Sequence, residues 1–254
     1  MPNIEDQATI EPSTRHERFR WHSGNLREVD ASMDALSRSI HKAIAAKDEK
    51  TVQSLSRHYT LALGMWSEVL LLKVLHEQRA FTFHEIDQIL RIAATDRWKE
   101  LVKLCFRNRF RTIDLNERTL PPSRFSQHKT LMESLENELL PIVNLRNRLA
   151  HGQLRYTLRN SYSSIDERLM RQLHRENIVT LQIKRRILFY ISRIVRSLAI
   201  WHPKFNEHFD KYYSVVISSN YELRTSKYED YCEELIARST RGRQYRQRNE
   251  AQAG

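Results

Sequence analysis

The chain has 254 residues, with 42 Lys and Arg, 31 Asp and Glu, and a formal net charge of +11 at pH 7. This length allows one large helical domain with appendages or two small domains, and 5 Gly and 6 Pro are too few for a fold with many tight turns. Cys105 and Cys232 lie far apart, which excludes a disulfide framework and favours a reducing compartment, so we expect a cytoplasmic protein.

Apolar residues at helical spacing predict long helices over residues 26–46 and 47–77 as an antiparallel hairpin. Further on, the predicted helical segments begin at 82 or 83, after a Thr95 N-cap, near 126, and then cover about 165–175, 178–202, 205–217 and 227–238. The fold class is therefore all-α, a bundle of long antiparallel helices. Its predicted parts are a flexible N-terminal arm (1–25), the bundle (26–202), a C-terminal helical extension (203–240) and a disordered basic tail (241–254).

Neither the N-terminus nor the longest apolar stretch predicts a membrane segment. The N-terminus is polar and acidic, unlike a signal peptide. The longest apolar stretch, residues 61–75, is interrupted by Ser67, Glu68 and Lys73. We expect no membrane partner.

The segment Arg146-Asn147-Arg148-Leu149-Ala150-His151-Gly152 concentrates polar chemistry at the predicted end of a helix. Asn147 and His151 are four residues apart and so neighbours on a helix, where an amide can bond one ring nitrogen and leave the other for proton transfer. Gly152 is a natural helix stop. Upstream, Pro141 predicts either a kink or a fresh first turn.

A structural explanation competes with a catalytic one for the same residues. On a helical projection Arg146 falls within the apolar arc, which requires a specific partner. That partner is either a ligand in a cleft or interface, or a structural carboxylate. Likewise, His151 is explained either as a proton-transfer group or as a cation that the helix dipole favours.

The bare spacing of Arg and His occurs twice, in Arg79 with His84 and in Arg146 with His151, so the spacing alone is no evidence. The second occurrence has Asn directly after Arg, and in this fuller form it resembles the signature of the HEPN superfamily (higher eukaryotes and prokaryotes nucleotide-binding domains). The matching segment covers about eight residues, Leu145 to Gly152.

This resemblance implies an all-α homodimer that cleaves RNA without a metal or other cofactor, in a composite cleft at the dimer interface. It implies that Arg146 binds the scissile phosphate, Asn147 positions the imidazole, and His151 transfers the proton as the RNA 2′-hydroxyl attacks. It also implies a toxin or antiviral defence role, with an antitoxin or regulatory protein as partner.

Charge and aromatic patterning add predicted RNA contacts. Arg outnumbers Lys by 31 to 11, and its planar fork of donors suits phosphate. The helix predicted over 178–202 carries an arginine stripe with Phe189 among it. The predicted RNA-binding residues are Arg148, Arg185, Arg186, Arg193 and Arg196. For any one of them, a solvated helix face explains the charge as well.

Sequence motifs of other enzyme classes are absent. The sequence has no Gly-rich phosphate loop, no Ser nucleophile elbow and no His-Glu-x-x-His or Cys-His cluster, so we predict no metal site and no cofactor. Two alternatives to a nuclease stay open: a non-catalytic helical module that binds RNA or a protein, and a helical scaffold whose positive charge is incidental.

Overall fold

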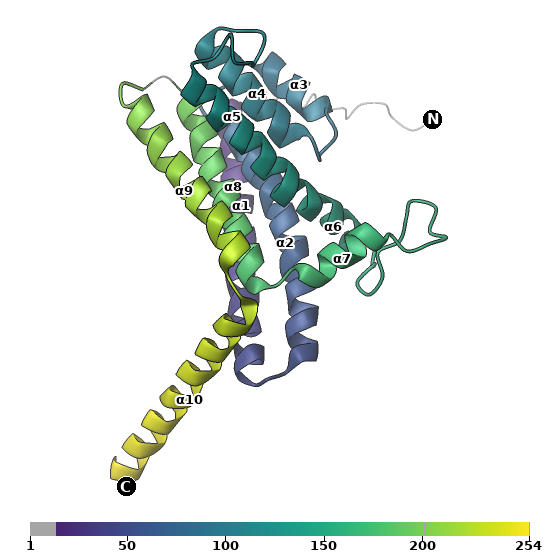
Figure 1. Ribbon diagram of the computed structural model, residues 1–254, viewed down its shortest axis with the longest axis vertical. Coiled ribbons are helices and arrows are strands. Elements are labelled where there is room, and N and C mark those ends of the chain that lie inside the picture. The colour runs from purple at the N-terminus through teal and green to yellow at the C-terminus, as the bar shows by residue number, and fades with distance from the viewer. Residues whose placement is uncertain (1–13, 201, 254) are drawn as a thin grey trace, which may run out of the picture.

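The computed structural model describes residues 14–200 and 202–253, and in this part of the chain it is helical, as Figure 1 shows. The elements are α1 (Arg15–Ala45), α2 (Glu49–Leu75), α3 (Phe83–Arg91), α4 (Arg97–Phe110), α5 (Pro122–Ser134), the π-helical turn η1 (Leu135–Leu139), α6 (Leu140–Ala150), α7 (Glu167–Arg175), α8 (Ile178–Ala199), α9 (Phe205–Thr225) and α10 (Tyr228–Ala253). Extended pairing within the described ranges is limited to an isolated bridge between Leu158 and Ile165. The prediction of an all-α fold is confirmed.

A single large apolar core joins most of the helices. Helices α1 and α2 form the predicted antiparallel hairpin, and α8 lies against it (Figure 1). Large side chains that are almost completely buried come from α1, α2, α3, α4, α5, η1, α8 and α9, and they include Met33, Ile40, Tyr59, Leu63, Trp66, Leu75, Ile86, Leu101, Phe106, Leu131, Leu135, Leu181 and Phe209. Such interdigitated packing fixes how the helices sit relative to one another.

Helix α9 belongs to this core, although its sequence pattern is weaker than that of α8. It packs along α8, and its Phe209 and Val216 are fully buried. The segment that follows residue 203 thus packs on the bundle through α9, and the same core extends beyond the boundary predicted at 202.

Residues 15–25 are helical, which corrects the prediction of a flexible arm for them. Thr14 and Glu17 form a capping box that satisfies the first free N–H groups of α1. Phe19 then lies near the Lys73 ammonium, 5.8 Å from the ring centre. Contacts with α2 help to hold residues 15–25 in the helix, although their sequence lacks apolar periodicity. Residues 1–13 lie outside the described part.

Residues 241–253 are also helical, which corrects the prediction of a disordered tail there. They continue α10, which leaves the bundle and extends away from it (Figure 1). Arg, Gln and Glu are good helix formers, so a polar composition does not prevent a helix that is already started. The first turns of α10 are anchored on α1, where the Tyr231 hydroxyl and His41 Nε2 are 2.8 Å apart.

Two predicted helix starts are shifted. Helix α4 begins after Asp96 rather than after Thr95, whose hydroxyl donates to the Asp96 carboxylate instead of capping the helix. Helix α5 begins at Pro122, a position that proline tolerates because the first helical N–H has no partner. In the described ranges, no helix is both long and apolar enough to cross a lipid bilayer.

Candidate functional site

Helix α6 carries the motif, and the π-helical turn η1 leads into it. The Leu140 N–H donates to the Leu135 carbonyl, five residues earlier. Pro141 has no N–H, and its ring would collide with the carbonyl four residues before it in a regular helix. The wider turn relieves this collision, so Pro141 sits in the fresh first turn of α6.

The end of α6 is a Schellman motif centred on Gly152. The Gly152 N–H donates to Leu149 O at 3.0 Å, and the Gln153 N–H donates to Arg148 O at 3.1 Å. Gly152 has φ +77°, a conformation that residues with a Cβ seldom adopt. The predicted helix stop is confirmed, and it leaves His151 as the C-cap with an exposed side chain.

Arg146 packs on α2 at Gly64. A Cβ added to Gly64 would lie 2.4 Å from the Arg146 Cβ, so only glycine permits this approach. The arginine stem crosses Gly64, and its Nη2 forms an ion pair with Oε1 of Glu68, one turn further along α2. Of the two partners considered for Arg146, a ligand or a structural carboxylate, this structure contains the carboxylate, Glu68.

The Arg146 guanidinium keeps donor capacity beyond this ion pair. Its side chain is 20% exposed and that of Glu68 is 34% exposed, so the pair lies at the surface rather than in the core. Partial burial lowers the pKa of Arg146 from its usual value, although a guanidinium stays charged in proteins. Nε is buried and has no hydrogen-bond partner, whereas Nη2 holds the carboxylate.

His151 and Asn147 are both exposed, and the structure does not join them. Within the described residues, neither side chain makes a hydrogen bond to the other. Helical side chains lean toward the N-terminus of their helix, and Arg146 follows this rule in reaching Glu68. A single copy of the chain thus points the guanidinium toward α2 and leaves the imidazole in solvent.

Arg148 holds the loop that follows the motif. Its Nη2 donates to Oδ1 of Asn160 at 2.7 Å. The predicted RNA contact is therefore engaged in binding the loop over residues 151–166, which projects beside α7 (Figure 1).

The four arginines of α8 share a groove of about 680 Å³ with residues of α1 and α2. Phe189 is 43% exposed there, as the predicted aromatic contact requires. Each arginine also has a partner outside α8: Arg185 with Asp30 (2.5 Å) and Asp34 (3.4 Å), Arg186 with Glu222, Arg193 with the Tyr212 hydroxyl (3.2 Å), and Arg196 with Glu77 (2.6 Å), which lies just after α2.

These partners weaken the case for a bare phosphate track. Ion pairs at such partly exposed positions contribute only about 0.2–1 kcal/mol each, so a phosphate can compete for the same guanidinium groups. Lys73 also lines the groove, where Asp30 and Glu77 are the carboxylates. The groove is therefore lined by more positively than negatively charged side chains.

Sequence reasoning missed two residues that shape the motif's surroundings, Gly64 and Glu68. A lone glycine inside the predicted helix of residues 47–77 was the available signal for Gly64, because a glycine there costs helix stability unless close packing needs it. Glu68 carried a comparable signal as a carboxylate that interrupts the longest apolar stretch.

No group of three or more His, Cys, Asp or Glu residues in the described ranges is arranged to hold a metal ion. The chain matches no protein-family model, no curated protein and no solved structure. The residues and their geometry are therefore the only basis for a functional proposal.

Proposed function

We propose that this protein is a metal-independent endoribonuclease of HEPN type, acting as a homodimer. The observation that carries the proposal is the end of α6, where the imidazole of His151 is exposed at a fixed C-cap one and a half turns beyond the half-buried Arg146. Around this pair stands the fuller motif Arg146-Asn147-x-x-x-His151 in an all-α fold.

The proposed reaction is transesterification within the RNA backbone. The 2′-oxygen attacks the neighbouring phosphorus, the bond from phosphorus to the 5′-oxygen breaks, and a 2′,3′-cyclic phosphate remains. One His151 takes the 2′-hydroxyl proton and another supplies a proton to the 5′-oxygen, since histidine is the usual acid or base for such steps. Arg146 stabilises the charge on the phosphoryl oxygens.

The dimer supplies what one copy lacks. In a single copy the guanidinium and imidazole point to different places, so we propose that two α6 ends meet across a two-fold axis. The phosphate then takes Nη donors of Arg146 in competition with Glu68, and Asn147 orients the imidazole once the cleft forms. The proposed setting is cytoplasmic, as a toxin or defence nuclease under control of an antitoxin or regulatory protein.

The test is RNA cleavage in EDTA by wild type, His151→Ala and Arg146→Ala. We expect each substitution to lower the cleavage rate by about 10²- to 10⁴-fold, the usual range for loss of a general acid or base. His84→Ala is the matched control, because His84 is also exposed and follows Arg79 at the same spacing. It should cleave at the wild-type rate. Equal activity of His151→Ala and wild type would contradict the proposal.

A non-catalytic helical RNA-binding module is the second candidate, and the ion pair of Arg146 with Glu68 favours it. An arginine that serves only to bind α6 to α2 needs no phosphate. RNA binding by wild type that falls with salt, together with intact RNA after prolonged incubation, would support this candidate.

A further inference from the structure

The groove of the α8 arginines lies on the opposite side of α2 from the motif. Gly64 and Glu68 face α6, where both contact Arg146. Trp66 and Leu70, each two residues further along α2, line the groove instead. Residues two apart on a helix lie about 160° apart around its axis. RNA in this groove would therefore contact the protein away from the phosphate that the motif would cleave.

Charged and aromatic side chains alternate in one row of α8 along this groove. The members of the row are Arg186, Phe189 with Tyr190, Arg193 and Arg196. They follow one another at steps of three or four residues, so each is adjacent to the next on the helix surface. The backbones of Arg186 and Arg193 are about 10 Å apart along the axis, with the two rings between them. This order of cation, ring and cation suits the phosphates and bases of a nucleic-acid strand.

Two cations of the groove have no carboxylate partner. Arg193 donates from Nη2 to the Tyr212 hydroxyl at 3.2 Å, and its guanidinium carbon lies 5.3 Å from the centre of that ring. The Lys73 ammonium lies 5.8 Å from the centre of the Phe19 ring. Within residues 14–200 and 202–253, neither cation forms an ion pair with a carboxylate. A phosphate can therefore bind Arg193 and Lys73 without displacing a carboxylate.

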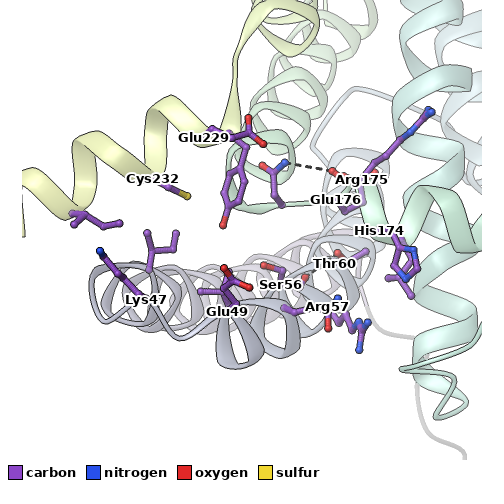
Figure 2. Close-up of a pocket in the computed structure, with 17 residues that line it drawn as sticks. Lys47, Glu49, Ser56, Arg57, Thr60, His174, Arg175, Glu176, Glu229 and Cys232 are labelled. Atoms are coloured by element: carbon purple, nitrogen blue, oxygen red, sulfur yellow. Dashed lines mark hydrogen bonds between the residues drawn. The ribbon is translucent and has the colours of Figure 1, made fainter.

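A second groove of similar size, about 700 Å³, has balanced charge and serves as an internal comparison. It lies between α2, the junction of α7 with α8, and the first turns of α10 (Figure 2). Its lining holds three carboxylates and three cationic side chains, the latter from Lys47, Arg57 and Arg175. The groove of the α8 arginines has five cationic and two acidic side chains in its lining. A polyanion is therefore favoured in the groove of the α8 arginines over the groove in Figure 2.

The aromatic rings select an unpaired strand over a duplex. Phe189 is 43% exposed, and the ring of Tyr190 supports it edge-on with ring centres 5.4 Å apart. An unpaired base can stack on such a ring whatever its identity. The bases of a duplex are stacked on one another and cannot reach it.

The groove is long enough for several nucleotides. At one end the Arg185 guanidinium carbon lies 5.6 Å from the Trp66 ring centre, and at the other end Arg196 pairs with Glu77. From Arg185 to Arg196, α8 rises about 16 Å. Successive nucleotides of a stacked strand are about 3.4 Å apart.

We propose that this groove anchors an unpaired stretch of RNA, with Arg193 and Lys73 binding phosphates and Phe189 stacking on a base. The anchor takes its RNA ligand from the proposed function and lies across α2 from the proposed cleavage site. It holds the substrate at a distance from the reacting phosphate, so its contribution is to affinity rather than to chemistry.

The experiment measures binding in the His151→Ala background, so that binding is independent of cleavage. A fluorescein-labelled single-stranded RNA is titrated over a series of salt concentrations. Lys73→Gln with Arg193→Gln should weaken binding about tenfold and reduce the salt slope by about 0.7 for each phosphate that is no longer neutralised. Phe189→Leu should weaken it about 5- to 100-fold, whereas Phe189→Trp should bind like the parent. Duplex RNA of the same sequence should bind the parent and Phe189→Leu equally.

Two controls match these changes elsewhere on the surface. Lys47→Gln with Arg57→Gln removes one lysine and one arginine from the groove in Figure 2. Phe83→Leu removes a ring that is 53% exposed on α3. Both controls should bind RNA within about twofold of the parent, and circular dichroism checks that every variant is folded. A charge control that loses as much affinity as the variant of Lys73 and Arg193 would overturn the anchor, because net charge alone would then explain the effect.

The outcomes separate this proposal from that of the nuclease. If wild type cleaves RNA and the variants of Lys73, Arg193 and Phe189 bind like the parent, the anchor is wrong and the nuclease stands. If these variants lose binding but wild type cleaves nothing, the anchor stands and the nuclease is wrong. If the parent binds no single-stranded RNA at all, the anchor is overturned.

Discussion

At the scale of single residues, Glu68 decides how available Arg146 is. In the proposed nuclease, the carboxylate and an incoming phosphate would compete for the same N–H donors, and the pair is exposed enough for exchange. The same contact that orders the guanidinium in the free protein would therefore oppose phosphate binding by Arg146.

We expect Glu68→Gln to raise the affinity of the His151→Ala protein for RNA several-fold, because the amide competes less well than a carboxylate for Arg146. Fluorescence anisotropy at constant salt measures the change. Glu100→Gln is the control, since Glu100 pairs with Lys103 on α4 and its substitution removes the same negative charge. An affinity for Glu68→Gln equal to that of Glu100→Gln would show that Glu68 does not restrain Arg146.

The residues of the motif show what the sequence can and cannot supply. The position of Arg146 on an apolar helix face predicted that it has a partner, and the helix end at Gly152 was predicted from its residue type. The identity of the partner was beyond reach, because Glu68 lies 78 residues earlier and only the packing of α6 on α2 brings it near. The partners of Arg185 and Arg196 come from α1 and from the turn after α2 for the same reason.

At the scale of elements, the contact of α2 with α6 depends on the missing side chain of Gly64. The motif helix can lie this close because Gly64 has no side chain. The Arg146 stem occupies the space that a side chain at position 64 would need. Tight packing of this kind tolerates added volume poorly.

We expect Gly64→Ala to lower the free energy of unfolding by about 1–3 kcal/mol, because the new methyl group collides with the Arg146 stem. Alanine is the better helix former, so without the collision the change would stabilise the protein. Gly24→Ala tests this directly: Gly24 lies in α1 with nothing within 4 Å of an added Cβ, and we expect a gain of about 0.5–1 kcal/mol. Urea denaturation measures both, and a stabilised Gly64→Ala would contradict the proposed collision.

Helix positions were predictable where apolar periodicity was strong and less so where tertiary contacts replace it. The hairpin of α1 with α2 and the long helix α8 follow from their apolar spacing. The first turns of α1 depend on a capping box and on contacts with the end of α2, which a periodicity analysis of residues 1–25 does not detect. The last turns of α10 form because nothing in their composition interrupts the helix.

At the scale of the whole molecule, several histidines are partly or fully buried in the bundle. Burial is the largest cause that lowers the pKa of His22, His41, His76 and His128. The unfolded chain then binds more protons than the folded chain as pH falls below about 6.5, the usual histidine value.

We therefore expect the free energy of unfolding to decrease as pH falls from about 7.5 to 5.5, with the decrease beginning near pH 6.5. Urea midpoints across this range measure it. His128→Phe should reduce the decrease, because His128 packs edge-on against Phe106 with ring centres 4.9 Å apart and its Nε2 is buried without a partner. The exposed His58, changed to Phe, should leave the pH dependence as it is. A stability that stays constant or rises toward pH 5.5 would contradict this account.

The π-helical turn η1 also sets the rotation of the helix that follows it. Successive residues of an α-helix are about 100° apart around its axis, so the extra residue that widens Leu135–Leu139 sets the azimuth of everything downstream in α6. Deleting one residue from η1 would leave the composition of the motif intact and yet swing Arg146 off Gly64 and redirect His151 by the same angle. The direction in which the motif side chains point thus depends on the number of residues in η1, which precedes the motif.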